Sequence, residues 1–276
     1  MRGQCICLVV LPFWALSAYA SAINVALGTA DSFAVLAGST VTNTGPTTVH
    51  GNLGVSPGSA VTGFLPGIVS GGSIHANDAV AMQAQNDLTT AYNFAAGEVC
   101  GTVLTGQDLG GLTLTPGVYC FASSAQLTGA LTLNAQGDPN AVFVFQIGST
   151  LTTASNSSVG FINGGQGDSV FWQVGSSATL GTTTAFAGNI LALTSITLTT
   201  GANIQCGRAL ARNGAVTMDT NDVSIDTAGC ETTTGGGPVP EPGTAMLIGL
   251  GLLVSLMIVI FVGQVGNRPD KFPIQD

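Results

Sequence analysis

Polar and apolar residues alternate in short stretches of this chain that return at nearly even spacing. Each stretch places a threonine before a large apolar residue, and six are clear: Thr113-Leu114, Thr132-Leu133, Thr150-Leu151, Thr179-Leu180, Thr197-Leu198 and Thr217-Met218. Their apolar positions advance by 19, 18, 29, 18 and 20 residues. A repeat of this size is typical of a solenoid. In a β-coil the apolar residue points inward and its neighbours outward, so stacked coils are predicted to present rows of hydroxyl and methyl groups.

Two further stretches of the same kind, Thr40-Val41-Thr42 and Ala60-Val61-Thr62, precede the main series. Glycine and proline punctuate them, as expected for the turns between short strands. The coils are therefore predicted to begin near Phe33.

The pattern breaks between Ala76 and Val99, a stretch without proline. Apolar and small residues recur there at helical spacing: Ala81, Ala84, Gln85, Leu88, Ala91, Tyr92 and Ala95. One α-helix is predicted from about residue 77 to residue 97, with Asn77 as its N-cap.

Two strand-like stretches, Val142–Ile147 and Val170–Val174, are apolar on both sides. Strands of this composition are covered on both sides, and the predicted helix is the natural cover. The threonine-bearing stretches alternate instead, so one side of each faces water. The fold class is therefore predicted to be mainly β: a parallel β-helix with one long α-helix packed alongside.

The composition of the chain excludes several classes of function. Only 7% of the 276 residues are charged, and the net charge is −9. A chain so poor in lysine and arginine is not expected to bind nucleic acid, because phosphates need neutralising side chains. A hydrophobic fraction of 45% also excludes a disordered acidic chain.

Residues 1–22 match a secretory signal. Arg2 supplies a basic residue, Cys7–Leu16 an apolar core, and Ala20-Ser21-Ala22 a small-residue cleavage site. The alternative is a buried N-terminal strand. Residues 23–231 are predicted to form the β-helix domain, secreted or held at the cell surface.

Export would place the domain in an oxidising compartment, where cysteines pair. Four cysteines remain after the leader, and they allow three pairings: Cys100, Cys120, Cys206 and Cys230. We favour Cys100–Cys120 and Cys206–Cys230, because each pair brackets neighbouring coils. Each closed loop of roughly 20 residues would contribute about 3 kcal/mol.

The C-terminal region changes character at Thr232. Residues 232–243 form a Thr/Gly/Pro linker that ends in Val239-Pro-Glu-Pro-Gly243. An uncharged stretch follows at residues 244–262, long enough as a helix to reach about 28 Å. The short polar tail, 263–276, carries Arg268 and Lys271. This order resembles the PEP-CTERM sorting signal, which implies removal by a sorting enzyme; retention as a membrane anchor is the alternative.

The body of the chain resembles the microbial ice-binding (antifreeze) proteins over about residues 25–226. The stretches that carry the resemblance are Gly51-Asn-Leu-Gly-Val-Ser-Pro-Gly58, Thr62-Gly-Phe64, Ala84-Gln-Asn-Asp-Leu-Thr-Thr-Ala-Tyr92, Leu112-Thr-Leu-Thr-Pro-Gly-Val-Tyr119, Gly137–Ala154, Val170–Gly181, Gly188-Asn-Ile-Leu-Ala192 and Gly207-Arg-Ala-Leu-Ala211. The resemblance implies a right-handed, discontinuous β-helix with a side helix, in which the N-terminal coils and the later coils are not consecutive in space. It also implies that one flat face of the β-helix adsorbs to an ice crystal surface.

Some members of that family carry Thr-(Ala/Gly)-x-(Thr/Asn) steps on this face. Three stand here, Thr44–Thr47, Thr153–Asn156 and Thr200–Asn203, while the coil between the last two reads Thr182-Thr-Thr-Ala185. Together with the outer positions of the repeat, they give the predicted ice-binding residues: Thr44, Thr47, Thr150, Thr152, Thr153, Asn156, Thr182, Thr197, Thr199, Thr200 and Asn203. Thr153 and Thr200 are expected to be exposed.

Two other functions fit a β-helix. A cell-surface adhesin or matrix protein would use the same face to bind glycan or protein. A polysaccharide-active enzyme would need paired carboxylates across one bond, which the sequence does not place, so no enzymatic activity is predicted. Three acids crowd the last coil, Asp219, Asp222 and Asp226, and a solvated cap is favoured there over a calcium site. No cofactor or metal is predicted.

Overall fold

The computed structural model describes residues 22–165 and 167–226. The predicted leader up to residue 21, the linker and the apolar stretch 244–262 lie outside the described residues. Within the described part no helix is long and apolar enough to cross a membrane.

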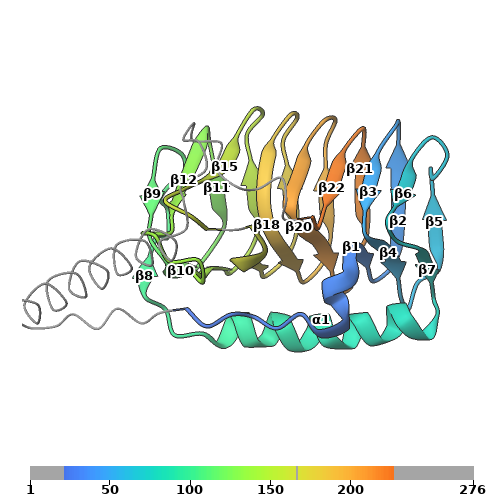
Figure 1. Ribbon diagram of the computed structural model, residues 1–276, viewed down its shortest axis with the longest axis horizontal. Coiled ribbons are helices and arrows are strands. Elements are labelled where there is room, and N and C mark those ends of the chain that lie inside the picture. The colour runs from blue at the N-terminus through green and yellow to red at the C-terminus, as the bar shows by residue number, and fades with distance from the viewer. Residues whose placement is uncertain (1–21, 166, 227–276) are drawn as a thin grey trace, which may run out of the picture. The chain divides into compact units, whose positions relative to one another are not determined.

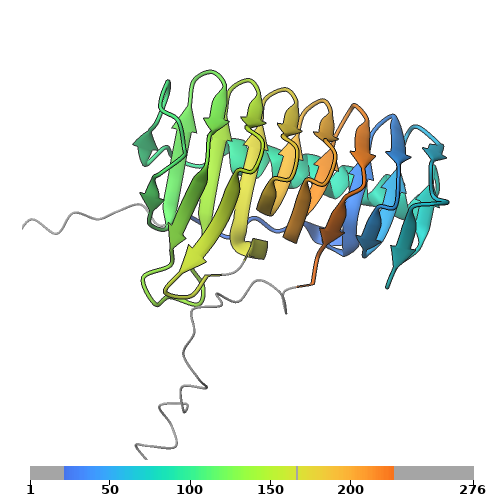
Figure 2. The ribbon, with the colours of Figure 1, turned by 90° about the horizontal axis from the view of Figure 1, so that it is seen from above.

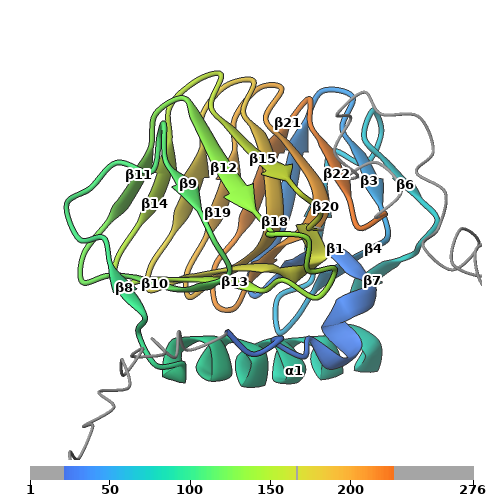
Figure 3. The same ribbon diagram turned by 60° about the vertical axis from the view of Figure 1, so that its left-hand side comes forward.

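The strands form a β-helix whose coils each have three sides (Figures 1 and 3). One side is a separate seven-stranded parallel sheet, which we call the threonine face. In spatial order its strands are β11 (Ala125–Leu127), β14 (Leu151–Thr153), β17 (Ala178–Leu180), β19 (Ile196–Leu198), β21 (Val216–Asp219), β2 (Thr40–Thr44) and β5 (Ala60–Thr62).

The other two sides belong to one fifteen-stranded sheet, because two long strands, β18 (Ala185–Ala192) and β20 (Asn203–Ala211), continue from one side to the other. The helix-covered face contains their C-terminal halves and β8 (Thr102–Val103), β10 (Gly117–Phe121), β13 (Phe143–Ile147), β16 (Val170–Val174), β1 (Phe33–Ala37), β4 (Asn52–Val55) and β7 (Ile74–Ala76). The third face contains their N-terminal halves and β9 (Thr113–Leu114), β12 (Ala130–Asn134), β15 (Ser158–Ile162), β22 (Asp222–Ser224), β3 (Thr48–His50) and β6 (Ile68–Ser70). Two 3-10 turns, η1 (Gly28–Ser32) and η2 (Gly167–Ser169), complete the described elements.

The order of coils in space differs from their order in the chain. The first coil packs on the last one: β1 pairs with β20, β2 with β21, and β3 with β22, all in parallel. The discontinuity implied by the family resemblance is therefore present. It lets helix α1 run back along the stack before the chain starts its second set of coils (Figure 2).

Helix α1 spans Ala79–Gly97 and covers the apolar outer side of the helix-covered face. The residues predicted from helical spacing are those that it buries, from Ala81 to Ala95. Among them, Ala84, Leu88, Ala91, Tyr92 and Ala95 share one buried cluster with residues of the sheet: Leu36, Leu210, Leu191, Phe171, Val144 and Val118. The N-cap is Asp78 and not Asn77, because the Asp78 carboxylate accepts the Ala81 N–H at 2.8 Å while Asn77 adopts a left-handed backbone with φ of 53°.

The interior of the coils is filled by stacked apolar side chains. Tyr119, Phe145 and Trp172 follow one another in successive coils, and the Phe145 and Trp172 ring centroids are 3.9 Å apart. Phe186, from the third face, packs against the Trp172 ring. Close packing of this kind fixes the register of the coils, since a shift by one residue would turn these rings outward.

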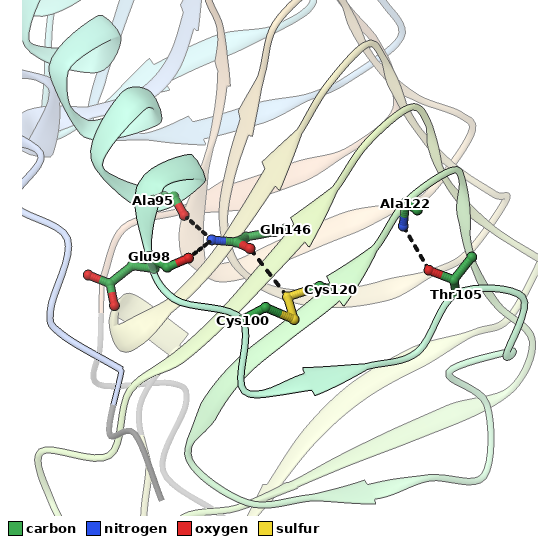
Figure 4. Close-up of a disulfide and its surroundings, with 7 residues drawn as sticks. All are labelled: Ala95, Glu98, Cys100, Thr105, Cys120, Ala122 and Gln146. Atoms are coloured by element: carbon green, nitrogen blue, oxygen red, sulfur yellow. Dashed lines mark hydrogen bonds between the residues drawn. A yellow bond between two sulfur atoms is a disulfide. The ribbon is translucent and has the colours of Figure 1, made fainter.

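The end of α1 is held to the coils by a disulfide and an amide (Figure 4). Cys100 and Cys120 are bonded, as predicted. Beside them, the Gln146 Nε2 group donates to the carbonyl oxygens of Ala95 at 2.8 Å and Glu98 at 2.7 Å. These bonds satisfy carbonyls at the helix end that have no partner within the helix. The other predicted pair, Cys206–Cys230, includes a residue outside the described ones, Cys230.

Candidate functional site

The threonine face carries one row of outward side chains that are in register from strand to strand. Backbone pairing aligns one residue of each strand: Gln126, Thr152, Thr179, Thr197, Thr217, Thr42 and Thr62. We call this row the threonine ladder. Six consecutive members are threonine, and all seven are exposed or half-exposed. Strands stack at about 4.8 Å, so seven strands extend over about 29 Å.

Alternation along each strand explains why the ladder faces outward. The two neighbours of Thr197 in its strand, Ile196 and Leu198, are buried, and so are Ala178 and Leu180 around Thr179. The inward residues join the main core. The sequence thus orients the ladder through the apolar residues on either side of each threonine.

The six threonine–apolar pairs of the sequence repeat do not all belong to this face. Thr113 and Thr132 lie in β9 and β12, which pair with each other on the third face. Thr150 lies on the threonine face but two positions before the ladder, because Leu151 aligns with Ala178. The ladder member of that coil is Thr152. The spacing of 29 residues in the sequence repeat combines this two-position shift with a longer coil, since the ladder residues Thr152 and Thr179 are 27 residues apart in the chain.

A second set of hydroxyls flanks the ladder. Thr150 Oγ1 donates to Ser124 Oγ at 2.9 Å, and Thr199 Oγ1 donates to the Leu180 carbonyl at 2.8 Å. The Thr182 and Thr199 hydroxyl oxygens are 3.5 Å apart. These predicted residues therefore lie beside the ladder and are held by bonds between neighbouring coils.

The Thr-(Ala/Gly)-x-(Thr/Asn) steps lie at the corner between the threonine face and the third face, in the turns seen at the top of Figure 1. Thr44, Thr200, Thr182 and Asn156 are exposed there. Asn203 begins β20 on the far side of the corner, where its Oδ1 accepts the Asp222 N–H at 2.7 Å.

Two predicted residues turn inward, contrary to expectation. Thr153 is 3% exposed, and its hydroxyl oxygen accepts the Gly181 N–H at 2.8 Å and contacts the Thr184 hydroxyl at 2.8 Å. Thr47 is fully buried, and its hydroxyl oxygen accepts the Asn221 N–H at 3.0 Å. Thr153 occupies an inward position of β14, where it pairs with the buried Leu127, and Thr47 turns inward just before β3. Both therefore stabilise the corner and do not form part of the exposed surface.

The sequence reasoning left five ladder members out of the predicted set: Gln126 and the four threonines Thr42, Thr62, Thr179 and Thr217. Each of these threonines stands next to an inward apolar residue of its strand, such as Val61 beside Thr62 and Leu180 beside Thr179. The signal was the threonine of the repeat itself, and it was obscured by the different phase of Thr150-Leu151.

The threonine face is nearly free of charge. Among the described strands of this face, Asp219 is the only residue with an ionisable side chain. Its carboxylate is already engaged, since Thr200 Oγ1 donates to it at 2.5 Å and Thr220 Oγ1 at 3.0 Å. The third face differs: His50 Nε2 lies 3.6 Å from Asp222 Oδ1 at its surface. Within the described part of the chain, no three His, Cys, Asp or Glu side chains gather in a way that would hold a metal ion.

Fold and face together define a parallel β-helix protein with a side helix and one nearly uncharged, hydroxyl-bearing sheet. A family model described as "Ice-binding-like" matches residues 35–224. The chain belongs to this ice-binding-like family, which is not an enzyme class.

Known relatives agree with this assignment. The chain is 59% identical over 258 residues to an ice-binding protein of Nostoc sp. (strain HG1). This alignment covers 93% of this chain and 94% of the Nostoc protein. Among solved structures, an ice-binding protein from an Antarctic biological consortium aligns with a TM-score of 0.72 and 49% identity over 78% of this chain and 96% of that one. The ice-binding protein of the Antarctic ascomycete Antarctomyces psychrotrophicus aligns with a TM-score of 0.71 and 40% identity, over 74% of this chain and 99% of that one.

Proposed function

We propose that this protein adsorbs to ice through the threonine face and so inhibits ice growth or recrystallisation. The observation that carries the proposal is the threonine ladder: six threonines in register on adjacent strands, without a charged member. The names of the relatives, which include an ice-binding protein at 59% identity, support it.

The chemistry of the ladder suits an ordered solvent layer. Threonine methyl groups restrain the water beside them, and hydroxyl groups bond to it as donor and acceptor. Each contact is weak, but a rigid sheet is ordered in advance and loses little entropy on binding, so contacts in register add up. Charged side chains would bind water in other geometries, and the face holds only Asp219, which is engaged by threonines. This activity requires no reaction on the protein, so we propose no enzymatic role.

The test is ice-affinity partitioning of the full chain, followed by one substitution at the centre of the ladder. Thr197 lies in β19, the fourth of the seven strands. Thr197→Tyr should abolish incorporation into ice and ice shaping, because a large ring would lift the face off the crystal. The melting temperature should change little, since the site is half-exposed.

Gln205→Tyr is the matched control. Gln205 is exposed in β20 on the third face, so the same bulky ring there should leave ice binding intact. If the protein is instead an adhesin that uses the threonine face, the wild-type protein should not partition into ice and should bind glycan or protein. A wild-type protein that stays in the liquid fraction would refute the proposal.

We further propose that the protein is exported and held at the cell surface through residues 244–262, either as an anchor or until a sorting enzyme removes them. The leader-like residues 1–22 and the Pro-Glu-Pro motif support this, and the Cys100–Cys120 disulfide is typical of oxidising compartments. Fractionation of the source cells, with the mass of the mature chain, tests it. A cytosolic protein of full mass would contradict it.

A further inference from the structure

Five stacked corner turns beside the threonine face share one unusual backbone position. In each turn one residue has a left-handed backbone: Asn156 (φ 59°), Thr183 (φ 55°), Gly201 (φ 72°), Thr220 (φ 56°) and Gly45 (φ 78°). Their equivalence follows from hydrogen bonds between successive turns. Asn156 N donates to Thr182 O, Thr183 N to Thr200 O, Gly201 N to Asp219 O and Thr220 N to Thr44 O, at 2.9–3.1 Å.

Threonine is a costly choice at this position. Glycine adopts a left-handed backbone freely and asparagine tolerates it, whereas a branched β-carbon makes the conformation a true outlier. Three of the five turns use glycine or asparagine. The other two keep threonine, and retained backbone strain is concentrated where a side chain has a function.

The two threonine side chains are arranged to remain at the surface. Both Thr183 and Thr220 are exposed. Thr183 lies across the next turn, where a Cβ on Gly201 would be 3.4 Å from the Thr183 methyl carbon. A Cβ on Gly45 would collide with the Thr220 hydroxyl. Threonine and glycine therefore alternate along the corner, and the glycine at position 45 leaves room for the Thr220 hydroxyl.

The hydrogen bonds of these threonines do not require the methyl group. Thr183 Oγ1 is 2.5 Å from Asn156 Oδ1 and 2.7 Å from Thr182 O. Thr220 Oγ1 donates to Asp219 Oδ1 at 3.0 Å. A serine or an asparagine would keep a polar group there with less strain, so structural bonding alone does not explain two threonines.

We infer that Thr183 and Thr220 extend the ice-binding surface around the corner of the β-helix. They lie beside a row of corner residues formed by Thr182, Thr200, Asp219 and Thr44. The one carboxylate of this row, that of Asp219, accepts hydrogen bonds from the Thr200 and Thr220 hydroxyl groups. Two coils separate Thr183 and Thr220, which corresponds to about 9.6 Å. The inference rests on the proposed function, because ice is the ligand of both surfaces.

The test is a double substitution that relieves the strain and removes the side chains. In Thr183→Gly with Thr220→Gly, the melting temperature should stay level or rise, while thermal hysteresis at equal concentration should fall. Opposite directions for stability and activity are expected only if the strain is retained for function. Unchanged hysteresis would overturn the inference.

A second variant is needed if the double glycine variant has a lower melting temperature than wild type. Thr183→Asn with Thr220→Asn keeps polar side chains that tolerate the backbone and lacks the methyl groups. Reduced hysteresis with an undiminished melting temperature supports the inference, and wild-type hysteresis refutes it. Hysteresis that falls only in step with the melting temperature in both variants also refutes it, because the threonines are then structural.

Gln136→Gly is the matched control for strain relief. Gln136 is also exposed with a left-handed backbone (φ 57°), but it follows β12 on the third face. Its replacement should raise stability without changing hysteresis. Thr197→Tyr separates the two proposals: loss of hysteresis there, with full activity in the double glycine variant, leaves the threonine face standing and refutes only the corner.

Discussion

The hydroxyl oxygens of Thr42 and Thr217 lie 3.4 Å apart although 175 residues separate them in the chain. They occupy adjacent strands, β2 and β21, where the first coil of the chain packs on the last. The threonine ladder therefore crosses the discontinuity of the β-helix without a break. Its continuity depends on the docking of two distant segments.

This continuity gives the first prediction. Thr42→Tyr should abolish ice shaping as fully as Thr197→Tyr, because both residues belong to one uninterrupted surface. Ice-crystal morphology in the presence of each variant is the measurement.

Thr48→Tyr provides the comparison for Thr42→Tyr. Thr48 is half-exposed in β3 of the third face, in the same coil. It should retain ice shaping. Activity that survives in the Thr42 variant would mean that the first coils do not contribute to the surface.

Much of this arrangement follows from the sequence. Helical spacing located the buried side of α1, and doubly apolar strands identified the face that it covers. The alignment of the coils with one another could not be predicted. The pair Thr150-Leu151 looks like the other threonine–apolar pairs, yet backbone pairing aligns Thr152, two positions later, with the ladder residue Thr179. Nor could local pattern separate Thr113 and Thr132 from the ladder, since both outer faces alternate.

The corner turns show a second limit of local pattern. Thr153 and Thr200 occupy the same position in the sequence motif, yet Thr153 is buried and Thr200 is exposed. The difference arises from where each turn leaves its strand. That depends on contacts between coils and is not written in the motif itself.

Burial of Thr153 leads to a stability prediction. Thr153→Ala removes the acceptor of the Gly181 N–H and the partner of the Thr184 hydroxyl, and should cost about 1–3 kcal/mol. The neighbouring Thr152→Ala, at an exposed position, should change the unfolding free energy by less than about 0.5 kcal/mol. Denaturant unfolding of both variants measures the difference. Equal small effects would show that the Thr153 bonds contribute nothing.

Gln126 is the last member of the ladder at its β11 end and the only one that is not threonine. Its replacement by threonine is expected to increase activity. Gln126 aligns with Thr152, is exposed, and has a longer side chain than its neighbours in the row. Gln126→Thr should lengthen the ladder from six threonines to seven and raise thermal hysteresis at equal concentration.

Gln205→Thr on the third face is the matched change and should leave hysteresis at the wild-type level. Lower hysteresis in Gln126→Thr would mean that the glutamine itself contacts ice. An unchanged value would place the end of the functional surface at Thr152.

Acid should weaken the attachment of α1. Asp87 on the helix accepts the Thr29 hydroxyl at 2.6 Å and the Thr29 N–H at 2.8 Å, and these bonds lower the pKa of the Asp87 carboxyl from 3.8. A carboxyl whose pKa is lower in the folded state contributes stability above its unfolded value and loses it as the pH falls through the folded value. The free energy of unfolding should therefore fall below a pH of 3.8.

Asp87→Asn isolates this contribution. The variant should be less stable than wild type at neutral pH and should lose less stability on acidification. Parallel pH profiles for the two proteins would show that other carboxyl groups govern acid unfolding, among them Asp78, whose pKa is lowered by the Ala81 N–H and by His75.

The Cys100–Cys120 disulfide should stabilise the domain without touching the ice-binding surface. It closes a loop with a sequence separation of 20 residues beside the end of α1. Replacing both cysteines with serine should lower the unfolding free energy by about 3 kcal/mol, since the unfolded chain regains its freedom. Thermal hysteresis below the melting temperature should remain at the wild-type value. Wild-type stability in the double serine variant would contradict the prediction.

Reductant added to that variant tests the other predicted pair. A further fall in melting temperature is expected if Cys206 is bonded to Cys230, and an unchanged melting temperature would count against that pairing.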